Sequence, residues 1–249
     1  MSGHSKWHNI RLRKGKMDAE RGAKFTRLVR EIIIASKTGG GNPDSNLRLR
    51  LAIQKARENS MPNDKIKNAI QRGTGEAEGV NYEEVTYEGY GPGGAAIMVE
   101  CMTDNRNRTV ADIRSIFGRT GGSLGETGCV GWIFTPKGVI TLPKSSVDED
   151  TLLGLALDSG AEDLKSDEEN YEIYSDPDSF PAVRDAIDQH GLKPINAEIT
   201  RIPSNTVKVE GKDASQLIRL MELLEDQDDV QNVHANFDIP DELLETSAK

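Results

Sequence analysis

The sequence predicts an α+β protein in which an N-terminal three-helix bundle precedes two βαββαβ domains, one inserted into the other. Three observations lead to this prediction. Apolar residues recur with helical spacing between about residues 18 and 73, and with a period of two from Glu84 onward. Short glycine-rich turns separate the later segments. Those segments give the order βαββαβ once in the middle of the remaining chain, and a second time if the segments on either side of it are joined.

Three helices are predicted in the basic N-terminal segment. The first begins at Asp18, a good N-cap, and ends near Lys37, before a run of three glycines. The second covers 46–59 and carries apolar residues on two sides, so we expect it to lie between two neighbours. The third begins at Pro62 and ends at Gly73, which we expect to be a left-handed C-cap.

The middle of the remaining chain contains one complete βαββαβ unit. Its strands show alternating apolar residues and its helices show 3.6-residue spacing. The segments are strand 138–142, helix 147–158, strand 161–165, strand 170–175, helix 178–189 and strand 195–201. This order is typical of the ferredoxin-like fold.

The segments on either side give the same order if they share one sheet, and an extra strand at 85–88 precedes them. They are strand 95–101, helix 109–119, strand 129–134, strand 205–209, helix 213–225 and strand 230–236. We therefore predict two ferredoxin-like domains, one inserted into the other. The predicted boundaries are 1–79 for the arm, bundle and linker, 80–136 plus 203–249 for the discontinuous domain, and 137–202 for the inserted domain.

Charge is distributed very unevenly along the chain. Residues 1–75 contain 17 Lys and Arg against 6 Asp and Glu, a net charge of +11. Residues 76–249 contain 14 Lys and Arg against 35 Asp and Glu, a net charge of −21. A basic segment on an acidic body is typical of proteins that bind nucleic acid. The alternative is that the basic segment docks onto the acidic remainder of its own chain.

The first candidate nucleic-acid-binding residues lie in an N-terminal arm and in the helix that follows it. The arm shows no hydrophobic period, so we expect it to become ordered on its partner. Trp7 stacks on a base or pins the arm to a core, and the sequence leaves both open. The helix is expected to present its cations on the face opposite its apolar stripe. These candidates are Lys6, Trp7, Arg11, Arg13, Lys14, Lys16, Arg21, Lys24, Arg27 and Arg30.

A second group of candidates lies in residues 103–109, Thr-Asp-Asn-Arg-Asn-Arg-Thr, at the predicted start of a helix. Free N–H groups and the positive end of the helix dipole favour an anion there. Arg106 and Arg108 add charge, and Asn105 and Asn107 complete the group. The alternative is that Asn107 or Thr109 caps the helix while the arginines pair with acidic residues.

Motifs for catalysis were sought and not found. The turn 89–94 is rich in glycine, but it lies between two strands and so differs from a nucleotide-binding loop. We therefore predict no enzyme activity, catalytic residue, cofactor, metal site or small-molecule substrate. Apolar runs such as 32–35 are far too short to cross a bilayer, and the first residues lack a secretory signal. We expect a cytoplasmic protein without membrane contact.

Three blocks of sequence resemble those of the YebC/PmpR family. They are Gly3-His4-Ser5-Lys6-Trp7, Glu88-Gly89-Tyr90-Gly91-Pro92-Gly93-Gly94 and Thr103-Asp104-Asn105-Arg106-Asn107-Arg108-Thr109. The resemblance covers nearly the whole chain, including Gly121-Gly122 and the run 228–231. It implies a helical N-terminal domain followed by two α+β domains, with no enzyme activity and no cofactor.

Members of the family are described as cytoplasmic, probable DNA-binding transcriptional regulators. Mitochondrial relatives and some bacterial ones are described as translational activators that act with the ribosome. The predicted function is therefore that of a DNA-binding regulator of transcription. The alternative is a ribosome-associated translation factor that contacts ribosomal or transfer RNA. The residues themselves do not choose between them, because no element shows a clear base-reading set of Asn, Gln and Arg.

Overall fold

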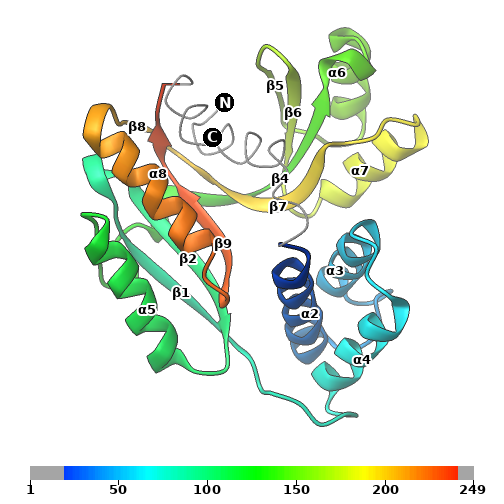
Figure 1. The fold of residues 1–249 in the computed structure, drawn as a ribbon. Helices are drawn as coiled ribbons and strands as arrows, with labels where there is room; N and C mark the ends of the chain where they lie inside the picture. Colours follow the sequence, from blue (N-terminus) through cyan, green and yellow to red (C-terminus); the bar gives the residue numbers. More distant parts are fainter. Residues whose placement is uncertain (1–19, 241–249) are drawn as a thin grey trace.

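The computed structural model describes residues 20–240, and the side chains of residues 22–240. Figure 1 shows a helical bundle and two layered units, each consisting of a β-sheet with two helices. We call the unit that contains the first and last strands the outer unit, and the one between them in the chain the inserted unit. The predicted fold class, α+β with an N-terminal three-helix bundle, is confirmed.

The bundle consists of α2 (Glu20–Gly39), α3 (Leu47–Glu58) and α4 (Asn63–Thr74). The side chain of Asn46 caps α3 by accepting a hydrogen bond from the backbone N–H of Leu49 at 3.1 Å. The core of the bundle is aliphatic, and its largest fully buried members are Ile32 and Leu49. Amphipathic spacing is therefore sufficient to explain these three helices.

The predicted end of α4 was wrong by two residues. The left-handed C-cap is Gly75, with φ of 81°, whereas Gly73 lies inside the helix. A Cβ atom on Gly73 would lie 2.6 Å from the Cβ of Ser36, and closer still to the carbonyl oxygen of Ile33. Gly73 therefore allows α2 and α4 to approach each other, and does not end the helix.

The outer unit has a four-stranded antiparallel sheet in the order β3-β1-β2-β9. Apolar residues of its central strand β2, such as Ile97 and Val99, pack against α5 and α8, whose contacts include Phe117 and Leu217. Figure 1 shows both helices on the same side of the sheet. The elements are β1 (Glu83–Tyr90), β2 (Ala96–Thr103), α5 (Arg106–Arg119), β3 (Ser123–Leu124), α8 (Gly211–Glu225) and β9 (Val230–Ala235).

Two predicted strands of the outer unit differ from the structure. No strand covers 129–134, because a 3₁₀ turn, η2 (Gly131–Ile133), leads directly into β4. The strand expected at 205–209 is only β8 (Val207–Lys208), which pairs in parallel with β10 (Phe237–Asp238) outside the main sheet. In the main sheet, β2 has β1 on one side and β9 on the other. A hairpin through η1 (Pro92–Gly94) joins β1 to β2, and such local pairing requires little loop closure.

The inserted unit has the predicted ferredoxin-like order of elements, with the sheet order β5-β6-β4-β7 and antiparallel pairing throughout. Its core joins Ile140 and Leu142 of the sheet to Leu152 on one helix and Phe180 on the other. The elements are β4 (Phe134–Pro143), α6 (Glu149–Asp158), β5 (Asp163–Ser166), β6 (Asn170–Ser175), α7 (Phe180–Gln189) and β7 (Asn196–Pro203), with a short 3₁₀ turn η3 (Lys144–Ser146).

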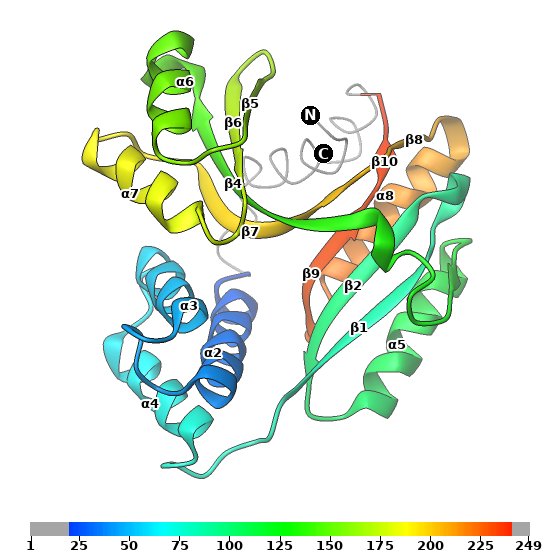
Figure 2. The same ribbon diagram turned by 180° about the vertical axis from the view of Figure 1, so that it is seen from behind.

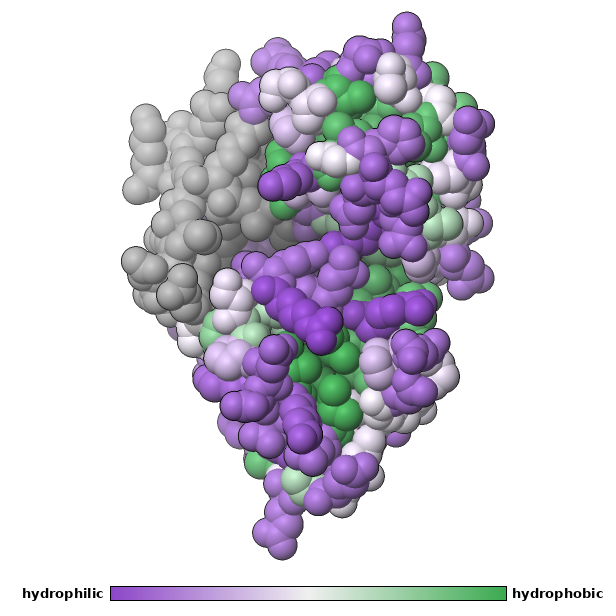
Figure 3. Space-filling model, turned by 90° about the vertical axis from the view of Figure 1, so that its right-hand side faces the viewer, coloured by the Kyte–Doolittle hydropathy of each residue, from purple (hydrophilic) through white to green (hydrophobic). Residues whose placement is uncertain are grey.

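The bundle contacts both other units, as the view from behind in Figure 2 also shows. Helix α3 lies below the inserted unit, and Leu51 packs against the core of that unit. This contact explains the second apolar side of α3 noted in the sequence. Figure 3 shows that the face formed by the bundle and the inserted unit is mainly hydrophilic, with smaller apolar patches. None of the helices in residues 20–240 has the length and apolar character that a bilayer crossing requires.

Replacement of Gly73 by alanine is expected to destabilise the protein by about 1–3 kcal/mol, because the added methyl group would force α2 and α4 apart. Urea denaturation followed by circular dichroism measures this change. Gly154→Ala in α6 is the matched control, since a Cβ there meets nothing within 4 Å. The control is expected to stabilise the protein by about 0.5–1 kcal/mol through helix propensity. A neutral Gly73→Ala variant would contradict the close approach of the helices.

Candidate nucleic-acid interface

The bundle exposes a group of cations that form no ion pair with the acidic side chains of residues 22–240. Its exposed basic residues include Lys24, Arg50, Arg57, Lys65 and Lys67. The ammonium of Lys65 lies 5.6 Å from the ring centroid of Phe25, and the other four form no ion pair with any residue between 20 and 240. Their positive charge is therefore available to an external anion.

Arg48 shows the opposite behaviour within the same bundle. Its guanidinium lies 2.7 Å from the carboxylate of Glu31 and 2.6 Å from that of Glu84. Lys37 is also engaged, because its ammonium donates to the side chain of Asn81 at 2.6 Å. The net charge of the segment thus overstates the number of cations that a ligand can reach.

Most of the arm residues predicted to bind nucleic acid lie outside the described part of the chain. Lys6, Trp7, Arg11, Arg13, Lys14 and Lys16 precede residue 20, and the side chain of Arg21 is also not described. Among the predicted residues of α2, Lys24 is exposed as expected. The side chains of Arg27 and Arg30, in contrast, are not exposed.

Arg27 and Arg30 face the outer unit, which corrects the expectation that they lie on a solvent-exposed face. The guanidinium of Arg27 donates to the backbone carbonyl of Glu225, and that of Arg30 donates to the carbonyl of Asp228. Arg30 also lies 3.1 Å from the carboxylate of Asp229, with 11% of its side chain exposed. Arg27 and Arg30 therefore dock onto the acidic remainder of the same chain, which is the alternative that the sequence left open.

The acceptors of these arginines form the acidic C-terminal end of α8. A helix leaves its last carbonyl groups without partners inside the helix, and its dipole places partial negative charge there. Residues 225–229 add four carboxylates, of Glu225, Asp226, Asp228 and Asp229. Two arginines from a separate unit therefore neutralise the end of α8, and this attaches the bundle to the outer unit.

Asp229 is the centre of a buried polar cluster. Its side chain is 2% exposed, and one of its carboxylate oxygens faces Arg30. The other oxygen accepts hydrogen bonds from Arg108 at 3.0 Å, the hydroxyl of Thr109 at 2.8 Å and that of Thr103 at 3.2 Å. One carboxylate thus connects the bundle, the end of β2 and the start of α5.

The pKa of Asp229 reflects two opposing effects. Burial of the carboxyl raises its pKa, but the hydrogen bonds from Arg108 and Thr109 and the charges of Arg30 and Arg108 outweigh this. The net result is that the pKa of Asp229 lies below its ordinary value. The cluster therefore contains a carboxylate, and the arginines contact it as an anion.

The loop 103–109 begins α5 as predicted, but a different residue caps the helix. The side chain of Asn105, not that of Asn107 or Thr109, accepts from the backbone N–H of Arg108 at 3.1 Å. Arg108 pairs with Asp104 at 2.8 Å as well as with Asp229. Arg108 is thus paired with acidic residues, as the second interpretation of this loop expected.

Arg106 is the freer of the two arginines in this loop. Its side chain is 60% exposed, and its nearest carboxylate is that of Glu83 at 3.8 Å. The neighbouring side chain of Asn107 is exposed too. Arg106 and Asn107 therefore form a second polar, positively charged point on the surface, on a different unit from the bundle.

The bundle is attached to the inserted unit by further ion pairs. The ammonium of Lys55 lies 2.7 Å from the carboxylate of Glu198, and the largely buried Arg184 pairs with Glu58. These contacts were missed in the sequence because the partners are more than a hundred residues apart. The only sequence signal was the second apolar side of α3.

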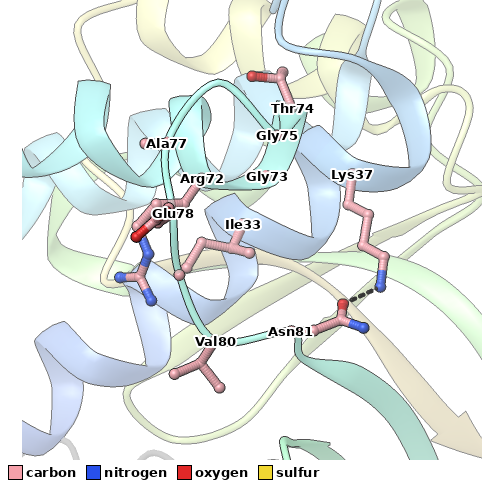
Figure 4. Close-up of a pocket in the computed structure, with 11 residues that line it drawn as sticks. Ile33, Lys37, Arg72, Gly73, Thr74, Gly75, Ala77, Glu78, Val80 and Asn81 are labelled. Atoms are coloured by element: carbon pink, nitrogen blue, oxygen red, sulfur yellow. Dashed lines mark hydrogen bonds between the residues drawn. The ribbon is translucent and has the colours of Figure 1, made fainter.

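A groove of about 680 Å³ lies between α2, the end of α4 and the linker that follows (Figure 4). Lys37 and Arg72 are the cations in its lining, and Glu78 is the acid. Figure 4 shows Lys37 turned toward Asn81, to which it is hydrogen bonded. The lining contains no His, Cys or Ser, and residues 20–240 contain no group of three or more potential metal ligands.

Two sequence models of one protein family match the chain. One is described as the TACO1/YebC protein N-terminal domain and matches residues 5–76. The other is described as the TACO1/YebC second and third domain and matches residues 82–237.

Similar proteins and a similar structure are also known. Proteins called "probable transcriptional regulatory protein" are 58% identical in Dictyoglomus turgidum, over 99% of both chains, and 57% identical in Pelotomaculum thermopropionicum, over 97% of this chain and 100% of that protein. The crystal structure of a conserved hypothetical protein from Aquifex aeolicus matches with a TM-score of 0.82 and 46% identity. That match covers 90% of this chain and 93% of the other.

Asp229→Asn is expected to lower the free energy of unfolding by about 3 kcal/mol near neutral pH, because it leaves buried arginine charge without its partner. In the unfolded chain this carboxyl titrates near 3.8, and in the folded protein its pKa is lower. Its stabilisation is therefore complete above the unfolded value, and is lost as the pH falls through the folded value. In urea denaturation, the difference between wild type and variant should shrink below about pH 4.

The control for this prediction is Asp228→Asn. It removes the same charge from the same turn, but the Asp228 side chain is exposed. We expect a change within about 0.5 kcal/mol. Equal destabilisation by the two variants would show that the charge of the turn matters, and not the Asp229 cluster.

Proposed function

The chain belongs to the TACO1/YebC family, as its sequence blocks predicted, and from this premise we propose that it regulates transcription by binding DNA through its basic N-terminal segment. The curated relatives are called probable transcriptional regulatory proteins, which supports a regulatory role. The observation that carries the proposal is the charge of the first 75 residues together with the exposure of their unpaired cations. We place this activity in the cytoplasm.

The proposed interface consists of backbone phosphates on one side and exposed cations on the other. The cations on the bundle are the exposed side chains of Lys24, Arg50, Arg57 and Lys67. Each contact of this kind releases a counterion from the nucleic acid, which makes binding strong at low salt. The arm residues from Lys6 to Lys16 and the side chain of Arg21 extend the same proposal.

Arg27 and Arg30 have a different role in this proposal. In the arrangement described above, their guanidinium groups are used to attach the bundle to the outer unit. We therefore assign them to positioning the bundle, and assign phosphate contact to the exposed cations. Asn105, Arg106, Asn107 and Arg108 form the second proposed contact, in which Arg106 is the principal cation because Arg108 is held by two carboxylates.

Contact with ribosomal or transfer RNA is the second candidate function. The observation that favours it is the presence of two separate cationic points, one on the bundle and one at the start of α5. A folded RNA can offer phosphates to both at once, and the sequence prediction that the arm becomes ordered on its partner suits RNA. In this candidate the protein is a translation factor, with no catalytic step of its own.

Replacement of Arg11, Arg13 and Lys14 together by alanine is expected to reduce the magnitude of the salt slope of binding by up to about three units, since each lost phosphate contact removes about 0.9 unit on duplex DNA. Fluorescence anisotropy with a labelled duplex at several salt concentrations measures this slope. Lys165, Lys193 and Lys212, which are exposed cations of the acidic body, provide the matched triple control. An arm variant with the slope of wild type would remove the arm from the interface.

The two candidate functions are separated by experiments in cells. Ultraviolet crosslinking identifies whether DNA or RNA contacts the N-terminal segment. Ribosome profiling of a deletion strain then tests the consequence. Pausing at particular codons or motifs supports the translation factor, whereas altered initiation at a few promoters with unaltered pausing supports the transcriptional regulator.

A further inference from the structure

The outer unit presents one aromatic side chain to solvent in an unusual way. Trp132 is 72% exposed, whereas the other large apolar side chains that are exposed among residues 22–240 range from 38% to 50%. Indole combines a large aromatic face with one polar N–H, and for this reason tryptophan is enriched at binding interfaces. Trp132 therefore has the character of a binding residue.

Trp132 is held in place by the sheet beneath it. It lies in η2, and the residues around it, Val130 and Ile133, are buried against Ala96 and Met98 of β2. These contacts are on the sheet face opposite the one that α5 and α8 cover. The indole N–H donates to the backbone carbonyl of Cys129 at 3.2 Å. The position of the ring is thus fixed before any ligand arrives, which reduces the entropic cost of binding.

A second aromatic ring is anchored at the same point. Tyr90 is 41% exposed, and its hydroxyl donates to the same carbonyl of Cys129, also at 3.2 Å. The polar edges of both rings are therefore occupied by the protein. The surfaces that stay available to a ligand are aromatic faces.

The loop that carries Trp132 is organised by a buried carboxylate. Glu88 accepts hydrogen bonds from the backbone N–H groups of Gly128, Val130 and Gly131 at 2.7–2.8 Å. Burial raises the pKa of Glu88, but these three hydrogen bonds outweigh it and lower the pKa below its ordinary value. At Gly131 a Cβ would lie 3.2 Å from this carboxylate, so the backbone approaches it closely.

The charge around this loop differs from that of the rest of the acidic body. Residues 118–133, which lead through this loop, contain one cation, Arg119, and one acid, Glu126. Residues 76–249 as a whole carry a net charge of −21. An anionic ligand is therefore repelled less here than elsewhere on the body, and a basic peptide is attracted less.

We propose that Trp132, with Tyr90 beside it, is a stacking site for an unpaired base of a single-stranded nucleic acid. Every base offers a π-face, so indole stacking needs no particular sequence. A base in a duplex is already stacked on its neighbours and is not accepted. The proposal rests on the proposed function, and adds that the ligand has a single-stranded part, which contacts the outer unit while the bundle contacts phosphates.

Intrinsic fluorescence tests the proposal directly. The chain has two tryptophans, so Trp7→Phe leaves Trp132 as the sole indole. Titration of this variant with oligouridylate is expected to quench the Trp132 emission, whereas a duplex RNA of equal length should not. In the otherwise wild-type chain, Trp132→Ala should weaken binding of labelled oligouridylate about tenfold, as expected for one lost stacked base. Trp132→Phe should lose less, since it keeps a ring.

The control is Leu157→Ala, which removes another exposed apolar side chain, on α6 of the inserted unit. It should leave the affinity unchanged, and circular dichroism should show all variants folded. Salt-dependent binding of oligouridylate without quenching, or with equal affinity for Trp132→Ala, would overturn this proposal and leave the proposed function intact. Absence of binding to oligouridylate, duplex RNA and duplex DNA would overturn the proposed function itself.

Discussion

The carboxylate of Asp229 is the contact on which the arrangement of the bundle and the outer unit depends. It lies in the turn between α8 and β9, and it is reached by Arg30 from the bundle and by Arg108 and Thr109 from α5. A buried carboxylate is tolerated only when its charge and lone pairs are satisfied, and here two guanidinium groups and two hydroxyls satisfy them. Because the donors come from distant parts of the chain, the cluster can form only when both units are in place.

The positive charges of the bundle are divided between contacts with the other units and the exposed surface. An excess of eleven positive charges over the first 75 residues suggests a uniformly basic surface. In the structure, some of these cations hold the units together, as Arg30 does at Asp229 and Lys55 does at Glu198. Others, such as Arg50 and Arg57, are exposed and have no acidic partner within the part of the chain that the structure describes. The basic segment thus combines an internal role and an external one, on different faces of the same helices.

The outer unit uses the same physical principle at Glu88, where a buried carboxylate orders a loop. Three backbone N–H groups bind it, and the loop that results holds Trp132 at the surface. Asp229 joins two units, whereas Glu88 fixes a glycine-rich loop within one unit. Both carboxyls have pKa values below their ordinary ones, because hydrogen bonding to the ionised form outweighs burial.

The sequence by itself determined the elements and their character. Local periodicity predicted α3 and β6 nearly to the residue and the end of α2 to within two residues, whereas the predicted start of α2 at Asp18 lies outside the described residues. The order of elements predicted the inserted unit, because these signals lie within a few neighbouring residues. Only the tertiary structure decided which partner each residue meets. Arg27 and Arg30 find their acceptors 198 residues away. β2 pairs with β1 through a local hairpin, whereas β8 pairs with β10 outside the main sheet. The exposure of Trp132 was likewise invisible in the sequence, since it depends on how the loop folds over the sheet and not on any repeating pattern.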